Sequence, residues 1–164
     1  MSEDFVKISV LISQDLIRQR ICELAEEITR DYTGCDLLVL GILNGSVPFL
    51  ADLVRCIELP LVYDFVAFSS YQGTESTGEV KTVRPLKVDV KGKHVLIVED
   101  IVDTGRTLTS SGCLTSLIQH GAESVKICAL LDKPSRRLVP LNIDYCGFTI
   151  EDKFVIGYGL DYNG

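Results

Sequence analysis

The feature that most constrains the fold is the segment Leu37–Leu43, which is apolar on both faces. A strand without a polar face must be covered on both sides, which is typical of a parallel strand packed between helices. Further apolar runs of strand length follow at 61–68, 95–98, 125–131 and 145–150. With helical segments between them, these runs predict an α/β fold: a mostly parallel, twisted sheet flanked by helices.

Helical periodicity lies between the apolar runs. Residues 13–32 predict an amphipathic helix that Ser13 caps and that stops near Gly34. Residues 48–55 predict a short helix with Pro48 in its first turn. Residues 107–120 predict a single helix that Gly121 ends.

Length and composition limit the class of protein. A chain of 164 residues predicts a single domain over 1–164, and a hydrophobic fraction of 46% excludes a disordered chain. The net charge of −7 argues against a nucleic-acid or anionic-membrane surface. No apolar run approaches the roughly 18 residues of a membrane span, and residues 1–4 lack a signal-peptide flank. We expect a soluble, cytoplasmic protein without nucleic-acid or membrane partners.

The cysteine and histidine content argues against a zinc or thiol site. There is no CxxC pair, and His94 and His120 are the only histidines. We expect reduced thiols that are buried as small hydrophobic residues. The cysteines are Cys22, Cys35, Cys56, Cys113, Cys128 and Cys146.

The strongest chemical signal is the segment 95–108, VLIVEDIVDTGRTL. Four apolar residues end in Glu99 and Asp100, which places two carboxylates at the carboxyl edge of a strand, where α/β sheets bind ligands. In the following run 103–107, DTGRT, a flexible Gly105 lets backbone N–H groups converge on one phosphate beside hydroxyls and Arg106.

Carboxylates beside a phosphate cradle suit sugar hydroxyls, or a Mg²⁺ that bridges them to a diphosphate. A ligand with a 5-phosphate, vicinal hydroxyls and a Mg-bound diphosphate satisfies every group, and phosphoribosyl diphosphate is that ligand. Other nucleotide motifs fail, because the chain has neither G-x-x-x-x-G-K-[ST] nor G-x-G-x-x-G.

The segment 98–107 resembles the phosphoribosyl-diphosphate motif of the type I phosphoribosyltransferases. Four further segments resemble the hypoxanthine-guanine phosphoribosyltransferases, in order: 43–46 (LNGS), 69–71 (SSY), 131–134 (LDKP) and 152–162 (DKFVIGYGLDY). The resemblance covers nearly the whole chain. It implies that family's sheet with a small hood from the chain ends, and Mg²⁺-dependent transfer of a phosphoribosyl group to hypoxanthine or guanine, giving IMP or GMP and diphosphate.

The resemblance also implies roles for residues near the phosphate. Asp103 is the candidate general base opposite purine N7, the alternative being a helix N-cap. Glu99 and Asp100 would hold the ribose hydroxyls and the metal, the alternative being a solvated loop. The phosphate cradle would be Thr104, Gly105, Arg106 and Thr107, for which a plain strand-to-helix turn is the alternative.

For the purine, the resemblance places Ile101 on one face of the ring and Phe154 on the other, although either alone reads as core. Lys133 would donate to the 6-oxo group, the alternative being a surface lysine that begins a basic loop with Arg136 and Arg137. Val155 would offer backbone groups to the base edge. Asp161 would lie by the purine and organise a second Mg²⁺.

Two loops are implied to bind and cover the diphosphate. Asn44 and Gly45 would bind it through backbone N–H groups, in a loop that can carry a non-proline cis peptide bond in the family. Asn44 stands where many relatives have a basic residue. Residues 69–84 predict a long lid loop with Ser70 and Tyr71 closing over the site, the alternative being a hairpin without a role.

Family members continue past the LDY segment with a strand and a diphosphate-binding arginine, so we expect the C-terminal end to be incomplete. The resemblance also implies a homodimer or homotetramer. One other class stays open as an alternative: a regulator of the same fold that senses the ligand or binds RNA, which the negative charge disfavours. A receiver domain is discounted, because its acidic pair would lie nearer the start of the domain than residues 99–100.

Overall fold

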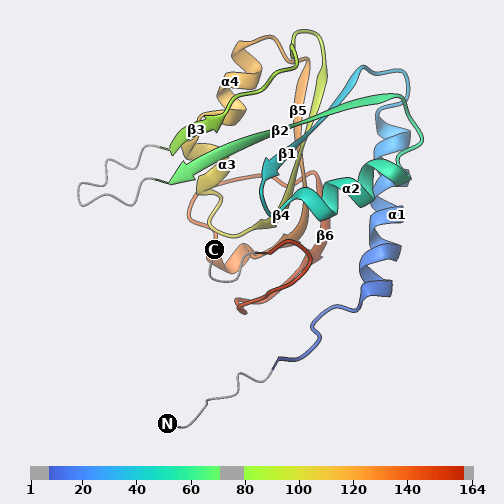
Figure 1. Ribbon diagram of the computed structural model, residues 1–164, viewed down its shortest axis with the longest axis vertical. Helices are drawn as coiled ribbons and strands as arrows, with labels where there is room; N and C mark the ends of the chain where they lie inside the picture. The colour runs from blue at the N-terminus through green and yellow to red at the C-terminus, as the bar shows by residue number, and fades with distance from the viewer. Residues whose placement is uncertain (1–7, 71–79, 161–164) are drawn as a thin grey trace, which may run out of the picture.

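The structure is a computed structural model that describes residues 8–70 and 80–160. Along the chain (Figure 1) the elements are α1 Gln14–Asp31, β1 Leu37–Leu43, α2 Val47–Cys56, β2 Leu61–Ser70, β3 Val80–Arg84, β4 His94–Val102, α3 Arg106–Ser110, α4 Cys113–Gln119, β5 Ser124–Asp132, the 3-10 turn η1 Pro134–Arg136 and β6 Tyr145–Thr149. The strands of the described part form one sheet in the order β3-β2-β1-β4-β5-β6. Every neighbouring pair is parallel except β2 and β3, which are antiparallel.

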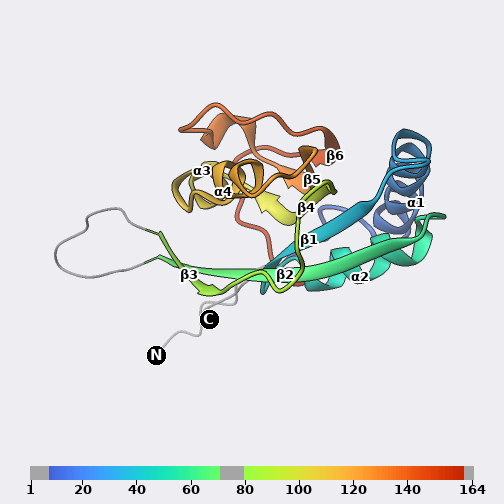
Figure 2. The same ribbon diagram turned by 90° about the horizontal axis from the view of Figure 1, so that it is seen from above.

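The sheet is covered on both faces, as the two-sided apolar strand predicts. Leu37 and Val39 of β1 belong to the core cluster that contains α1 and α2. Leu38 and Leu40 belong to the opposite cluster, with residues of α3 and α4. Figure 2 shows the two helix pairs on opposite sides of the sheet. The α/β fold class is therefore confirmed.

The first helix forms where its periodicity predicts. The Ser13 hydroxyl accepts a hydrogen bond from the Leu16 N–H at 3.3 Å, so Ser13 caps α1. The apolar face of α1 is buried against the sheet through Ile21, Leu24 and Ile28. The helix ends at Asp31, close to the predicted end, and Gly34 follows with a left-handed φ of 81°.

The single helix predicted over 107–120 is wrong, because the chain is interrupted between α3 and α4. Gly112 has a φ of 66° and precedes α4 as its N-cap. Apolar residues on both sides of the break, Leu108 and Leu117, face the same core cluster. The spacing of the apolar residues is therefore that of one continuous helix, although the helix itself is interrupted.

Two strand predictions also need correction. Strand β4 continues to Val102 rather than ending at residue 98, so Glu99 and Asp100 lie inside the strand. Pairing with β5 includes Glu99 and continues to Val102. The predicted loop 69–84 contains the end of β2 and all of β3, which pairs with β2 across a register shift at Ala67/Phe68. The rest of that loop, including Tyr71, lies outside the described residues.

The cysteines are free thiols, but only Cys113 and Cys128 are buried, so the prediction of burial is wrong for the other four. In the ranges 8–70 and 80–160, no helix combines the length and the apolar character needed to cross a membrane.

Candidate active site

The candidate residues gather at one edge of the sheet because β1, β4 and β5 are parallel and in register. Gly41 of β1 pairs with Val98 of β4, and Val102 of β4 pairs with Asp132 of β5. The loops that follow these strands therefore begin side by side. They carry the predicted diphosphate loop, the predicted phosphate cradle and Lys133.

The two carboxylates of β4 are held in a poorly solvated position. Glu99 is only 6% exposed, and its burial, with Asp100 beside it, raises the pKa of its carboxyl well above the ordinary value. Burial also raises the pKa of Asp100, although the Ile101 N–H donates to Asp100 Oδ1 at 2.9 Å. The solvated-loop alternative is therefore wrong, and the pair suits a ligand that brings hydroxyl donors or positive charge.

The loop after β1 lies directly against Asp100. A Cβ added to Gly45 would stand 2.6 Å from Asp100 Cγ and closer still to Oδ2, so no larger residue fits without moving that carboxylate. The preceding Leu43–Asn44 peptide bond is cis. The buried Ser46 hydroxyl donates to the Ile42 carbonyl at 2.6 Å, which ties the loop back to β1.

The loop after β4 turns at Gly105, which has a left-handed φ of 81° and is the N-cap of α3. The Thr104 hydroxyl accepts a hydrogen bond from the Arg106 N–H at 3.3 Å. The side chains of Arg106 and Thr107 are exposed. Because α3 spans a single short turn, a phosphate here would depend more on the loop N–H groups and side chains than on a helix dipole.

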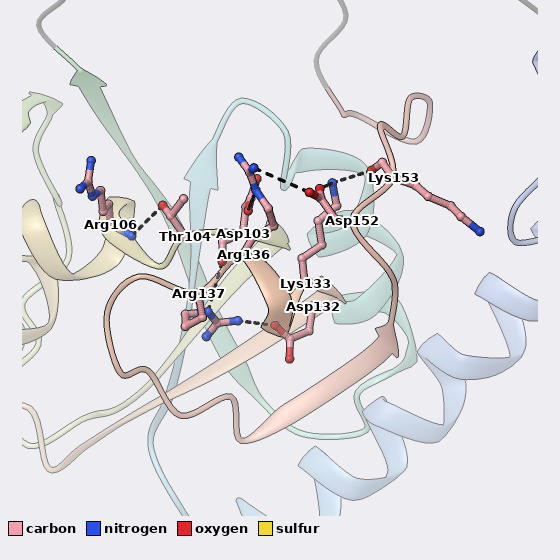
Figure 3. A network of polar contacts seen from close by, with 9 residues as sticks. All are labelled: Asp103, Thr104, Arg106, Asp132, Lys133, Arg136, Arg137, Asp152 and Lys153. Carbon is pink, nitrogen blue, oxygen red and sulfur yellow. Dashed lines mark hydrogen bonds and ion pairs between the residues drawn. The ribbon is translucent and has the colours of Figure 1, made fainter.

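Asp103 does not cap α3, so that alternative is wrong. Its carboxylate Oδ1 instead accepts a hydrogen bond from Arg136 Nε at 3.2 Å (Figure 3). Arg136 follows β5 in the turn η1, so the contact joins the ends of two neighbouring strands.

The segment after β5 also braces the backbone of the Asp103 loop. Arg137 is 15% exposed, donates through Nε to the Asp103 carbonyl at 3.2 Å, and pairs through Nη2 with Asp132. The N–H groups of Leu138 and Val139 both point to the Thr104 carbonyl, at 3.1 and 3.4 Å. The position of the predicted phosphate cradle is therefore set by residues more than thirty positions later.

Sequence reasoning assigned no role to Arg136 or Arg137. The available signal was two adjacent arginines directly after a buried strand that ends in an acidic residue. Such a pair at the ligand-binding edge of an α/β sheet has carboxylates and carbonyls within reach.

Lys133 is buried rather than a surface lysine. Its Nζ donates to the Lys153 carbonyl at 2.5 Å and lies 3.9 Å from Asp152 Oδ1. Figure 3 shows the ammonium directed at the segment 152–153, which precedes the predicted purine-binding residues. Lys133 and this segment are thus brought together.

The remaining predicted purine residues are less enclosed. Ile101 and Val155 are half-buried and pack on the same core cluster, whereas Phe154 is 79% exposed, so Phe154 is not a core residue. Phe154 and Val155 line a groove of about 1220 Å³ between residues 8–22, α2 and residues 153–160. Ser70 ends β2, and Asp161 lies outside the described residues.

Within the described ranges, no three His, Cys, Asp or Glu side chains cluster as a ready-made metal site. Glu99 and Asp100 are two neighbouring carboxylates at the sheet edge. Proteins commonly hold Mg²⁺ through one or two such carboxylates together with substrate phosphates.

Comparisons with known proteins agree with this geometry. The family described as "Phosphoribosyl transferase domain" matches residues 11–163. The hypoxanthine-guanine phosphoribosyltransferase of Lactococcus lactis is 51% identical over 154 residues, covering 93% of this chain and 82% of that protein. The hypoxanthine phosphoribosyltransferase of Haemophilus influenzae is 46% identical, with coverage of 94% and 88%. A crystal structure of a hypoxanthine phosphoribosyltransferase from Staphylococcus aureus superposes with a TM-score of 0.88 at 44% identity, covering 94% of this chain and 83% of that one.

Proposed function

Because this chain belongs to the phosphoribosyl transferase domain family, we propose that it transfers the 5-phosphoribosyl group of phosphoribosyl diphosphate to hypoxanthine or guanine, in purine salvage. The observation that carries the proposal is the shared sheet edge. A carboxylate pair, a Gly-turned loop with Asp103 and a buried lysine meet there from β4 and β5. The products would be IMP or GMP and diphosphate.

At the sugar end, the ribose hydroxyls would donate to Glu99 and Asp100, and the 5-phosphate would accept from the loop 104–107. The buried position of Glu99 supports this, because the ligand replaces the water that the carboxylate lacks. The diphosphate would bind the backbone of Asn44 and Gly45. With an asparagine at position 44, no cation at that position would contribute.

At the purine end, Lys133 would donate to the 6-oxo group, which favours oxopurines over adenine. Ile101 and Phe154 would flank the ring, and Val155 would contact its edge. As N9 forms the new bond to C1 of the ribose, the C1–O bond to diphosphate breaks. The N7 proton passes to the Asp103 carboxylate.

The donor set fits Mg²⁺, with Glu99 and Asp100 as protein ligands and Asp161 as a third candidate. When bound, the ion would neutralise the charge that develops on the leaving diphosphate. The lid role of Ser70 and Tyr71 and assembly as a homodimer or homotetramer belong to the same proposal. Closure would keep water from the cation-like sugar.

The experiment that tests the proposal is product formation. Purified protein mixed with hypoxanthine, phosphoribosyl diphosphate and Mg²⁺ should form inosine monophosphate and diphosphate in equal amounts, and omission of Mg²⁺ should suppress both. The same assay with guanine and xanthine ranks the bases. Folded protein that forms no nucleotide from any of the three bases would refute the proposal.

A further inference from the structure

Two adjacent arginines after β5 contact Asp103 in different ways. Arg137 is mostly buried and donates to the Asp103 main-chain carbonyl, so it holds the loop. Arg136 is 50% exposed and donates from Nε to the Asp103 side-chain oxygen Oδ1 at 3.2 Å. The first contact fixes the backbone and the second bears on the carboxylate alone.

Arg136 has a second anchor. Its Nη1 lies 3.7 Å from Asp152 Oδ2, and the other oxygen of Asp152 lies 3.9 Å from Lys133 Nζ. A line of alternating charges, Asp103, Arg136, Asp152 and Lys133, therefore spans the mouth of the site (Figure 3). A guanidinium can serve two carboxylates at once because its N–H donors point in fixed, different directions.

We infer that Arg136 is a positioning residue for the Asp103 carboxylate: it holds Oδ1, so that Oδ2 is presented to the purine. The inference rests on the proposed function, in which Asp103 receives the purine proton. The side chain of Asp103 is 39% exposed on a loop and has other rotamers available in water. Arg136 restricts it to one of these.

The line of charges also gives a reason for the placement of Arg136. Asp152 is shared between Arg136 and Lys133, so the residue that holds the proton acceptor and the residue that meets the 6-oxo group are anchored on one side chain. The separation between Asp103 and Lys133 is thereby restrained. A base that docks on Lys133 finds Asp103 already placed.

The test is a set of variants assayed for hypoxanthine turnover. Arg136→Gln removes both the charge and the planar set of guanidinium N–H donors. Arg136→Lys keeps the charge but has no such planar set of donors. Arg30→Gln is the matched control, because Arg30 is an exposed arginine in the last turn of α1 whose described ion pair, at 3.5 Å, is with Asp31. Thermal unfolding of each variant checks that the fold is unchanged.

We expect Arg136→Gln to lower kcat about tenfold, the size of coupling between contacting residues, while the KM of each substrate changes by less than about twofold. Arg136→Lys should recover part of the loss. Since Arg136 acts through Asp103, adding Arg136→Gln to Asp103→Asn should lower the residual kcat by less than about twofold.

Three results would overturn the inference while leaving the proposed function intact. The first is a near-wild-type kcat for Arg136→Gln. The second is a loss of kcat on Arg136→Gln that is as large in the Asp103→Asn background as in the wild-type protein. The third is a raised KM for phosphoribosyl diphosphate at unchanged kcat. An inactive wild-type protein would instead refute the proposed function, so the two failures are distinguishable.

Discussion

At the scale of single residues, the contact of Gly45 with Asp100 leaves no room for a side chain at position 45. Its backbone lies against the Asp100 carboxylate, so a methyl group there would displace a predicted ribose and metal ligand. The side chain that gives way is therefore one that the proposed reaction uses.

We expect Gly45→Ala to raise the KM for phosphoribosyl diphosphate about tenfold or more, since one buried polar contact is worth about 1–3 kcal/mol. Steady-state kinetics with varied phosphoribosyl diphosphate measure this. Gly92→Ala, where nothing lies within 4 Å, is a control for glycine replacement away from the site, although its φ of 72° adds strain of its own. An unchanged KM in Gly45→Ala would contradict the proposed role of this loop.

Asp103 supports a second prediction. Replacement by asparagine keeps the shape and removes the proton acceptor, so kcat should fall about 100-fold or more. The KM for phosphoribosyl diphosphate should change little, because the phosphate and sugar are held elsewhere. Equal losses in kcat and in binding would indicate that Asp103 is structural.

At the scale of elements, the predicted bounds of a strand match the observed bounds best where the strand is most completely buried. Strand β1 has the predicted bounds because its residues face the core on both sides. Strand β4 is longer than its apolar run, since Glu99 and Asp100 are polar and end that run, while the backbone of Glu99, Ile101 and Val102 still pairs with β5. Strand β3 (VKTVR) was missed because its polar composition reads as a loop.

The junction of β2 with the chain after β3 depends on a buried aspartate. Asp64 accepts hydrogen bonds from the Phe65 N–H at 2.8 Å, the Lys87 N–H at 2.9 Å and Arg84 at 3.2 Å. Burial on its own raises the pKa of Asp64, but these donors outweigh it, and the net effect is a pKa below the ordinary value.

A folded-state pKa below the unfolded value of about 3.9 means that ionised Asp64 stabilises the fold above that pH. The contribution is lost as the pH falls through the folded-state pKa. We expect Asp64→Asn to lower the free energy of unfolding by about 1–3 kcal/mol at pH 7 and by less at pH 3. Urea denaturation at both values measures this, with the exposed Asp15→Asn as control. A loss that is the same at both values would contradict the prediction.

A hydrogen bond joins α2 to the chain after β6. The Tyr158 hydroxyl donates to Asp52 Oδ2 at 2.6 Å, and Tyr158 packs on the core cluster of α1 and α2. The segment that carries Phe154 and Val155 is thereby attached to the helix that follows the predicted diphosphate loop.

Tyr158→Phe should reduce stability by about 1 kcal/mol and raise the KM for hypoxanthine, because one hydrogen bond to a carboxylate is lost while the ring stays. Denaturation and steady-state kinetics measure the two effects. Tyr63→Phe is the matched control, since Tyr63 is an exposed ring on β2. A KM that changes equally in both variants would contradict the link to the purine site.

At the scale of the whole molecule, net charge separates the transferase from an RNA-binding regulator. With a net charge of −7, the protein should show no salt-dependent retention of RNA. Filter binding at about 50 and 200 mM salt measures this, with a basic RNA-binding protein as positive control. Retention that weakens steeply with salt would favour the alternative.

The sequence predicted which loops meet at the site, because parallel strands deliver their carboxyl ends to one edge. It did not predict the contacts between those loops. The hydrogen bonds of Arg136 to Asp103 and of Leu138 to Thr104 join positions more than thirty residues apart. Such pairs depend on the β4–β5 register, which the apolar runs do not specify.

The Thr104 carbonyl that accepts from both Leu138 and Val139 has a consequence for protein engineering. In a library that diversifies residues 103–107 alone, the segment 136–139 still matches only the original loop, so most members should misplace the predicted phosphate-binding loop. Libraries that diversify 103–107 and 136–139 together can restore the fit. New acceptor or sugar preferences should therefore be found mainly as paired changes.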